Sequence, residues 1–160
     1  MSVLISFISI AVLTAVDQVI KFVVERYLQP IGSVEFINGF IGWNYVRNTG
    51  AAFGSFSQST TLISIVTGIV ILAGIVLIAT KKIKSKFYLT CAVMVISGGL
   101  GNLIDRVLKG YVVDFIEVQF TDFAVFNFAD ILVTVGAIAI MIYVIVDMFR
   151  ERKKTGEKHE

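Results

Sequence analysis

The stretch VFNFADILVTVGAIAIMIYVIVDMF, residues 125–149, decides how this chain must fold. It is long and apolar enough to cross the hydrocarbon core of a bilayer, which takes about 20 mostly apolar residues. It nevertheless carries an acid, Asp130, near its start. Because an ionised carboxylate is costly in hydrocarbon, we expect Asp130 to face the interior of a helix bundle rather than lipid.

The composition of the whole chain agrees with a membrane protein and excludes several other classes. Of 160 residues, 56% are hydrophobic and only 16% are charged, which is far too apolar for a soluble domain of this length. A net charge of +2 without a basic stripe argues against a nucleic-acid partner. Cys91 is the only cysteine and His159 the only histidine, so the sequence predicts no disulfide, metal or cofactor.

Four runs are long enough to span a membrane, and together they form a single integral membrane domain over residues 1–160. The first lacks a basic n-region and a small-residue cleavage site, so we interpret it as a retained helix rather than a removable signal peptide. The predicted spans cover residues 3–24, 60–80, 87–106 and 126–149, followed by a basic tail over 150–160.

The distribution of basic residues predicts the orientation of these spans. The short connection 81–86, KKIKSK, carries four lysines, and the tail over 150–160 is also rich in lysine and arginine. Because cytoplasmic loops are enriched in these residues, we expect this connection and both termini to lie in the cytoplasm. The two longer connections, 25–59 and 107–125, then lie outside.

The first outer connection is predicted to contain a small β-sheet. Between residues 25 and 59, short β-like runs are broken by glycines, and Trp43, Tyr27 and Tyr45 suit the lipid headgroup layer. The predicted fold is therefore an all-α membrane protein, a bundle of four transmembrane helices with a small extracytoplasmic β-sheet between the first and second helices.

With this orientation, the costly polar groups converge on the outer edge of the membrane. A transporter would more typically hold such groups near the midplane, on interrupted helices. Their convergence instead favours a site that meets its substrate at the outer interface. The residues concerned are Asp17, Lys21, Asn48, Asn102, Asp105, Arg106, Asp114, Asn127 and Asp130.

Several of these residues also have purely structural interpretations. Asp130 follows Asn127 by three residues, as an acid in the first turn of a capped helix would. Asp114 could be a solvated loop acid, although its flanking residues are apolar and would raise its pKa.

The basic residues have structural interpretations too. Asp17 and Lys21 could simply neutralise each other, with the lysine reaching the headgroups. Arg106 could extend to the interface, or pair with Asp105 or a lipid phosphate, instead of orienting the site. The glycines of SGGLGN, residues 97–102, would allow helices to approach closely.

The residues that remain for chemistry are carboxylates. Without a histidine near the membrane, serine–histidine and cysteine–histidine nucleophiles are excluded. Two neighbouring carboxylates can share a proton, so that one acts as general base toward water and the other as general acid. Asp114 and Asp130 are close enough in sequence to meet. The alternatives are a small proton-coupled transporter that uses the same acids and a non-enzymatic scaffold that binds lipid or a partner helix.

Five blocks of sequence carry a resemblance to a known family. They are DQVIK at 17–21, RNTGAAFG at 47–54, GGLGNLIDR at 98–106, VVDF at 112–115 and FNFAD at 126–130. In this order within a four-span chain, they resemble the bacterial lipoprotein signal peptidases (signal peptidase II), which are membrane-embedded aspartic proteases.

This resemblance implies a function and a set of site residues. Asp114 and Asp130 correspond to the catalytic dyad, and Asp17 with Lys21 to positions important for integrity or activity more than for the chemical step. The implied substrate is a prolipoprotein whose cysteine carries diacylglycerol, cut just before that cysteine at the outer face of the plasma membrane. Because four spans can form the site alone, we expect the protein to act as a monomer among membrane lipids. Positions around the substrate or the dyad correspond to Asn48, Gly50, Asn102, Arg106 and Asn127.

Overall fold

The computed structural model describes residues 2–50, 60–121 and 123–156. Parts of the predicted outer connection, 51–59, and of the tail, 157–160, lie outside the described residues. Within the described part, four helices are long and apolar enough to cross a membrane, which confirms the predicted fold class. The helices are α1 (Val3–Tyr27), α2 (Thr60–Ala79), α3 (Lys86–Lys109) and α4 (Phe128–Gly156), and the strands are β1 (Ser33–Ile37), β2 (Ile41–Asn48) and β3 (Val112–Val118).

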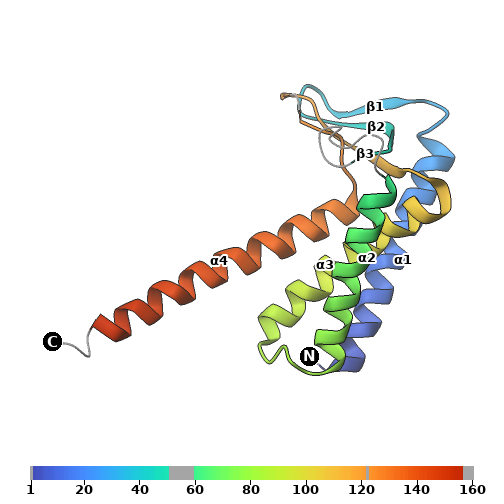
Figure 1. The fold of residues 1–160 in the computed structure, drawn as a ribbon. Helices are drawn as coiled ribbons and strands as arrows, with labels where there is room; N and C mark the ends of the chain where they lie inside the picture. The colour runs from blue at the N-terminus through green and yellow to red at the C-terminus, as the bar shows by residue number, and fades with distance from the viewer. Residues whose placement is uncertain (1, 51–59, 122, 157–160) are drawn as a thin grey trace.

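Helix α3 is the centre of the bundle, since it packs against each of the other three helices. It is the most buried of the four spans and also the least hydrophobic. The two properties have one cause: lipid solvates apolar side chains well, so small and polar residues are the ones that gain from helix–helix contact. Figure 1 shows α1, α2 and α3 side by side, while α4 leaves α3 at an angle and its C-terminal half stands apart.

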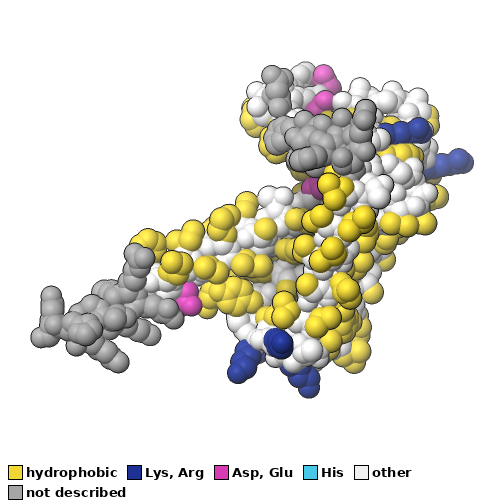
Figure 2. All heavy atoms as spheres, viewed as in Figure 1, with side chains coloured by type: hydrophobic (Ala, Val, Ile, Leu, Met, Phe, Trp, Pro, Cys, Tyr) yellow, Lys and Arg dark blue, Asp and Glu magenta, His cyan; other side chains and the backbone are white. Residues whose placement is uncertain are grey.

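The outward faces of α2 and α4 carry large exposed apolar side chains, as expected of surfaces in contact with acyl chains. Figure 2 shows hydrophobic side chains spread over the helices, with lysine and arginine at the two ends of the molecule. The exposed apolar residues include Leu62, Ile65, Ile69 and Leu72 on α2, and Ile138, Met141, Ile142 and Ile145 on α4.

The sheet is antiparallel, in the order β1-β2-β3, and lies at one end of the bundle. The sequence predicted strands only in the first outer connection, whereas β3 comes from the second outer connection, between α3 and α4. Gly110 makes this possible, because its φ of 79° ends α3 in a left-handed turn and sends the chain directly into β3. Asp114 is therefore a strand residue, paired with Val46 of β2, and not a loop acid.

The sheet is fixed to the bundle by a second hydrophobic cluster. Val113 and Phe115 of β3 pack with Val24 near the C-terminal end of α1, and Trp43 packs against this group. The Trp43 and Phe115 rings are stacked with their centroids 5.7 Å apart. This cluster holds β3, and with it Asp114, at a set position over the helix ends.

The connection between α2 and α3 lies at the end of the bundle opposite the sheet, as does the start of α1, whereas the far end of α4 projects away from the bundle (Figure 1). The lysines of that connection and the sheet are therefore at opposite ends of the molecule. This is the arrangement that the predicted orientation requires, and the orientation itself stays a prediction.

Close packing of α3 on α4 gives a first test. A methyl group at Gly98 would overlap the backbone carbonyl of Ala129 in the first turn of α4, and would lie 2.9 Å from a Val133 methyl group. We expect Gly98→Ala to lower the free energy of unfolding by about 1–3 kcal/mol. The added methyl group would meet the backbone of α4, so the start of that helix would have to move to make room. Thermal unfolding in detergent measures this effect.

The matched control is Gly68→Ala in α2, where an added methyl group meets nothing within 4 Å. That variant should melt at or slightly above the wild-type temperature, because alanine has the better helix propensity. Equal melting of the two variants would contradict the close contact between α3 and α4.

Candidate active site

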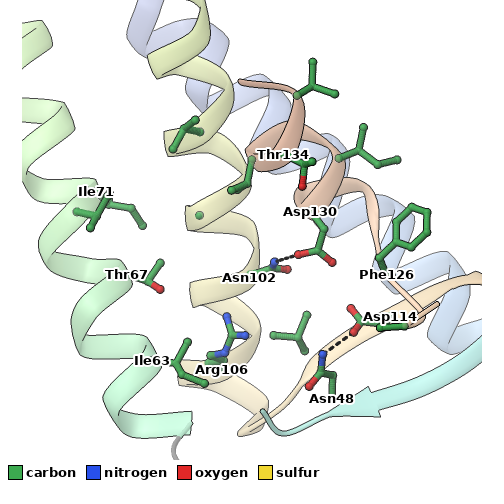
Figure 3. A pocket seen from close by; sticks show the side chains of 18 of the residues that line it. Asn48, Ile63, Thr67, Ile71, Asn102, Arg106, Asp114, Phe126, Asp130 and Thr134 are labelled. Carbon is green, nitrogen blue, oxygen red and sulfur yellow. Dashed lines mark hydrogen bonds between the residues drawn. The ribbon is translucent and has the colours of Figure 1, made fainter. Parts of the chain in front are cut away.

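Two carboxylates meet at the sheet end of the bundle. Asp114 comes from β3 and is only 1% exposed, and Asp130 comes from the first turn of α4. Both line one cavity of roughly 670 Å³ between α2, α3, α4 and the sheet. Figure 3 shows the two side chains pointing toward each other across this cavity, with Asn102, Arg106 and Asn48 around them.

The start of α4 sets the position of Asp130. The Asn127 side-chain oxygen accepts the Asp130 backbone N–H at 3.0 Å, and the Asp130 carboxylate accepts the Asn127 backbone N–H at 3.0 Å. This reciprocal pair is a capping box, which satisfies two N–H groups that a helix start otherwise leaves without partners. The helix-capping interpretation of Asn127 and Asp130 is therefore confirmed, and it leaves Asp130 on the cavity wall.

Asp114 is held by two asparagine amides. Asn127 Nδ2 donates to one carboxylate oxygen at 2.6 Å and Asn48 Nδ2 to the other at 2.8 Å. Burial raises the pKa of Asp114 to about 6 from an ordinary 3.8, and the negative charge of Asp130 adds to the rise. The hydrogen bonds from the two asparagines act in the opposite direction but do not cancel it.

Asn102, on α3, connects Asp130 to a buried lysine. Its Nδ2 donates to Asp130 Oδ1 at 2.8 Å, while its Oδ1 accepts from Lys21 Nζ at 2.8 Å and from Asn127 Nδ2 at 3.1 Å. The oxygen of this amide thus accepts two hydrogen bonds inside the site, and its nitrogen donates one to Asp130.

Arg106 supplies the cavity with a positive charge. Its Nη2 donates to the Gly50 carbonyl at 3.2 Å, and its buried Nε has no hydrogen-bond partner among the described residues. Gly50 is held from its other side, since its N–H donates to Asn48 Oδ1 at 2.9 Å. Arg106 does not pair with Asp105, one of the partners suggested by the sequence; Asp105 binds lysines instead.

The expectation that Lys21 reaches the headgroups is wrong. Lys21 is completely buried and lies 2.9 Å from Asp17 and 3.1 Å from Asp105. Its pairing with Asp17 is confirmed, but Lys21 also binds a second acid, Asp105, which the sequence suggested only as a partner of Arg106. The signal for Asp105 was its position on the same outer turn of α3 as Asn102, four residues before Lys109.

The remaining walls of the cavity are apolar. Side chains of α2 and α4 face each other across α3, so the polar groups at the sheet end continue into a hydrophobic groove. Gly99 of α3 lies at the base of this groove. The apolar walls include Ile63, Val66 and Val70 of α2 and Ile131 and Val135 of α4.

Among the described residues, no group of three histidine, cysteine or acidic side chains is placed to hold a metal ion. Two carboxylates that line one cavity can perform acid–base chemistry. Asp114 exchanges its proton near neutral pH, where a general acid or base is most effective.

Comparison with known proteins places the chain in a family. Residues 9–146 match the family model described as signal peptidase (SPase) II. The lipoprotein signal peptidase of Caldanaerobacter subterraneus is 42% identical over 135 residues, which cover 83% of this chain and 90% of that protein. The lipoprotein signal peptidase of Clostridium acetobutylicum is 39% identical over 151 residues, covering 92% and 96% respectively.

The structural comparison agrees. A bacterial membrane enzyme solved by the in meso method at 2.3 Å resolution superposes with a TM-score of 0.81 at 35% identity, covering 89% of this chain and 88% of that one. The four apolar helices and these relatives fit a multi-pass bacterial membrane protein. The chain belongs to the signal peptidase II family of membrane proteases.

Proposed function

We propose that this protein is an aspartic endopeptidase that removes the signal peptide from diacylglyceryl-modified prolipoproteins by cutting just before the lipidated cysteine. The observation that carries the proposal is the convergence of Asp114 and Asp130 on one cavity at the sheet end of the bundle. Relatives named lipoprotein signal peptidases support the substrate class. The proposed reaction needs no cofactor.

The reaction begins with a water molecule held between the two carboxyl groups. One aspartate accepts a proton from this water as its oxygen attacks the scissile carbonyl, and the other donates a proton to the carbonyl oxygen. Collapse of the tetrahedral intermediate then breaks the C–N bond, and a proton passes to the leaving amine. Two acids sharing one proton can fill both roles in turn.

The surrounding residues divide into two groups by their contacts. Asn48, Asn102 and Asn127 direct their amide N–H groups at the two carboxylates, so they orient the dyad. Arg106 lines the cavity and has no carboxylate ion pair among the described residues, so its positive charge is suited to stabilise charge on the substrate carbonyl. Gly50 fixes Arg106 through its carbonyl group.

The apolar groove between α2 and α4 suits a lipid-anchored substrate. A diacylglyceryl chain or a hydrophobic signal peptide can enter it sideways from the bilayer, while the peptide bond stays at the polar end. With both termini in the cytoplasm, that end lies at the outer membrane face, where lipidated cysteines are held. All of these groups come from one chain, so a monomer surrounded by membrane lipids is sufficient.

The transporter interpretation has less support. Asp130 lies in the first turn of α4 rather than at mid-span, and α1, α3 and α4 run unbroken past the polar groups. Transporters of the alternating-access type instead place their acids near the midplane on interrupted helices.

The test uses two synthetic precursor peptides that differ only in the diacylglyceryl group on cysteine. We expect purified protein to cleave the lipidated peptide and to favour it by more than about 10²-fold in kcat/KM, since burying only four methylene groups at about 0.8 kcal/mol each gives that factor. Mass spectrometry locates the cut. Equal cleavage of both peptides, or a cut at another bond, would refute the proposed specificity.

A further inference from the structure

Lys21 is a buried cation whose three protons are all used. It donates to Asp17 Oδ2 at 2.9 Å, to Asp105 Oδ2 at 3.1 Å and to Asn102 Oδ1 at 2.8 Å. Lys21 and both acids are completely buried, next to α4 and β3, and none of them lines the cavity. Burying a charge is costly even when it is paired, so an arrangement of this kind needs a reason beyond stability.

The first arm runs through Asp17 to α4. The other carboxylate oxygen of Asp17 accepts the backbone N–H of Ala129 at 3.0 Å. Ala129 is the residue immediately before Asp130, in the helix turn whose N–H groups lack partners within the helix. Asp17 therefore ties α1 to the backbone that carries Asp130.

The second arm runs through Asp105 to β3. Asp105 Oδ2 accepts the backbone N–H of Val113 at 3.2 Å. Val113 is the residue immediately before Asp114. The two acids that bind Lys21 thus make the same contact, each holding the backbone N–H of the residue before one member of the dyad.

The third arm runs through Asn102. A lysine ammonium group can only donate hydrogen bonds, so Lys21 requires the oxygen of the Asn102 amide to face it. The amide nitrogen must then face the opposite way, where it donates to Asp130 Oδ1. Lys21 thereby determines that the amide nitrogen of Asn102, and not its oxygen, faces Asp130.

We propose that Lys21, Asp17 and Asp105 form a positioning clamp that sets the separation and orientation of Asp114 and Asp130. None of the three touches substrate; each acts through a backbone amide or through Asn102. The clamp rests on the proposed function, because it positions groups that the function requires. It gives Asp105 the same role as Asp17, which the family resemblance did not include.

The decisive variant is the double substitution Lys21→Gln with Asp17→Asn. It removes one positive and one negative charge together and leaves Asp105 paired with Lys109, whose ammonium lies 3.1 Å away. We expect it to melt near the wild-type temperature. Because a small misplacement of catalytic groups slows the chemical step, kcat for the lipidated precursor should fall about 10- to 100-fold, while KM changes little. Asp105→Asn, which matches Asp105 in size, should show the same split between kcat and KM.

The pH profile gives a readout that a merely structural role would not move. The charge of Lys21 favours the ionised form of Asp114, so its loss should shift the acidic limb of kcat/KM to higher pH. A variant that is only less stable would have a lower kcat/KM at every pH, with the acidic limb at the wild-type pH. Among the described residues, the other groups that act on Asp114 are unchanged in this variant: Asn48 of β2, Asn127 just before α4, Asp130 of α4 and Arg106 of α3.

The matched control is Lys109→Gln. Lys109 pairs with Glu25 at 2.8 Å and with Asp105, but it contacts neither Asn102 nor either of the held backbone amides. The kcat of this variant should stay within about twofold of wild type. The acidic limb of its pH profile should stay at the wild-type pH.

The outcomes separate the two proposals. A folded double variant with wild-type kcat and an unshifted limb overturns the clamp, as does Asp105→Asn with wild-type kcat. Asp114→Asn, assayed in parallel, reports on the function itself. If Asp114→Asn cleaves normally, the proposed function fails; if it is inactive while the clamp variants are fully active, only the clamp fails.

Discussion

Replacing Asp114 or Asp130 by asparagine should reduce cleavage of a diacylglyceryl-modified precursor by about 10³-fold or more, since each carboxyl group must exchange a proton during turnover and an amide cannot. The size of the side chain is unchanged, so both variants should insert and fold. The measurement is the single-turnover rate of product formation by purified protein in detergent. Normal activity in either variant would eliminate the two-aspartate mechanism.

The matched control for this prediction is Asp147→Asn. Asp147 is on the same helix as Asp130, but it lies toward the other end of α4 and does not line the cavity. The same chemical change there should leave the rate within about twofold of wild type. A comparable loss in all three variants would indicate a general effect of lost charge and not a role for the dyad.

The spans and the placement of the polar groups were predictable from sequence because the bilayer imposes one-dimensional rules. A run of apolar residues of sufficient length must be a helix, since the hydrocarbon core leaves backbone groups no other partners. Once the direction of each span is set, the depth of Asp17, Asn102 or Asp130 follows from its position along the helix. In the structure these groups lie together at the sheet end of the bundle, as that rule predicts.

The third strand could not be predicted in the same way. Pairing of β3 with β2 joins Val112 to Asn48, which are far apart in sequence, and no local pattern specifies such a partner. The run VVDFIEV was visible as apolar residues around an acid, yet its assignment to a loop or a strand depends on whether a neighbouring strand is present.

The environment of Lys21 was missed for a related reason. A lysine one turn from the outer end of a span ordinarily extends to the headgroups, and that local rule was applied. Here α3 brings Asp105 and Asn102 within reach, so the lysine finds three acceptors without leaving the bundle. Only the packing of α1 against α3 contains that information.

The geometry of the dyad also implies that the site is held at a cost in stability. Asp114 has a pKa raised from 3.8 to about 6 in the folded protein. The folded state therefore binds this proton more tightly than the unfolded state does. The resulting stability is fully present below about pH 4 and is lost as the pH rises through 6, which amounts to roughly 3 kcal/mol at 1.36 kcal/mol per unit.

Asp114→Asn removes this dependence, because an amide does not titrate in this range. We expect the free energy of unfolding of the wild-type protein to fall relative to that of the variant by roughly 2.4 kcal/mol between pH 4 and pH 7, which is most of the full effect. The measurement is chemical or thermal unfolding of both proteins in the same detergent across that range. Other acids titrate equally in both proteins, so they cancel in the difference.

The loss of one hydrogen bond offsets part of the stability that Asp114→Asn gains at high pH. Asn48 and Asn127 both donate to Asp114, and an asparagine there can accept only one of the two hydrogen bonds. That loss is independent of pH, so it displaces the curve of the variant without changing its slope. A difference between the two proteins that stays constant from pH 4 to pH 7 would show that Asp114 keeps an ordinary pKa, and would remove the argument that burial and Asp130 prepare it for proton exchange near neutrality.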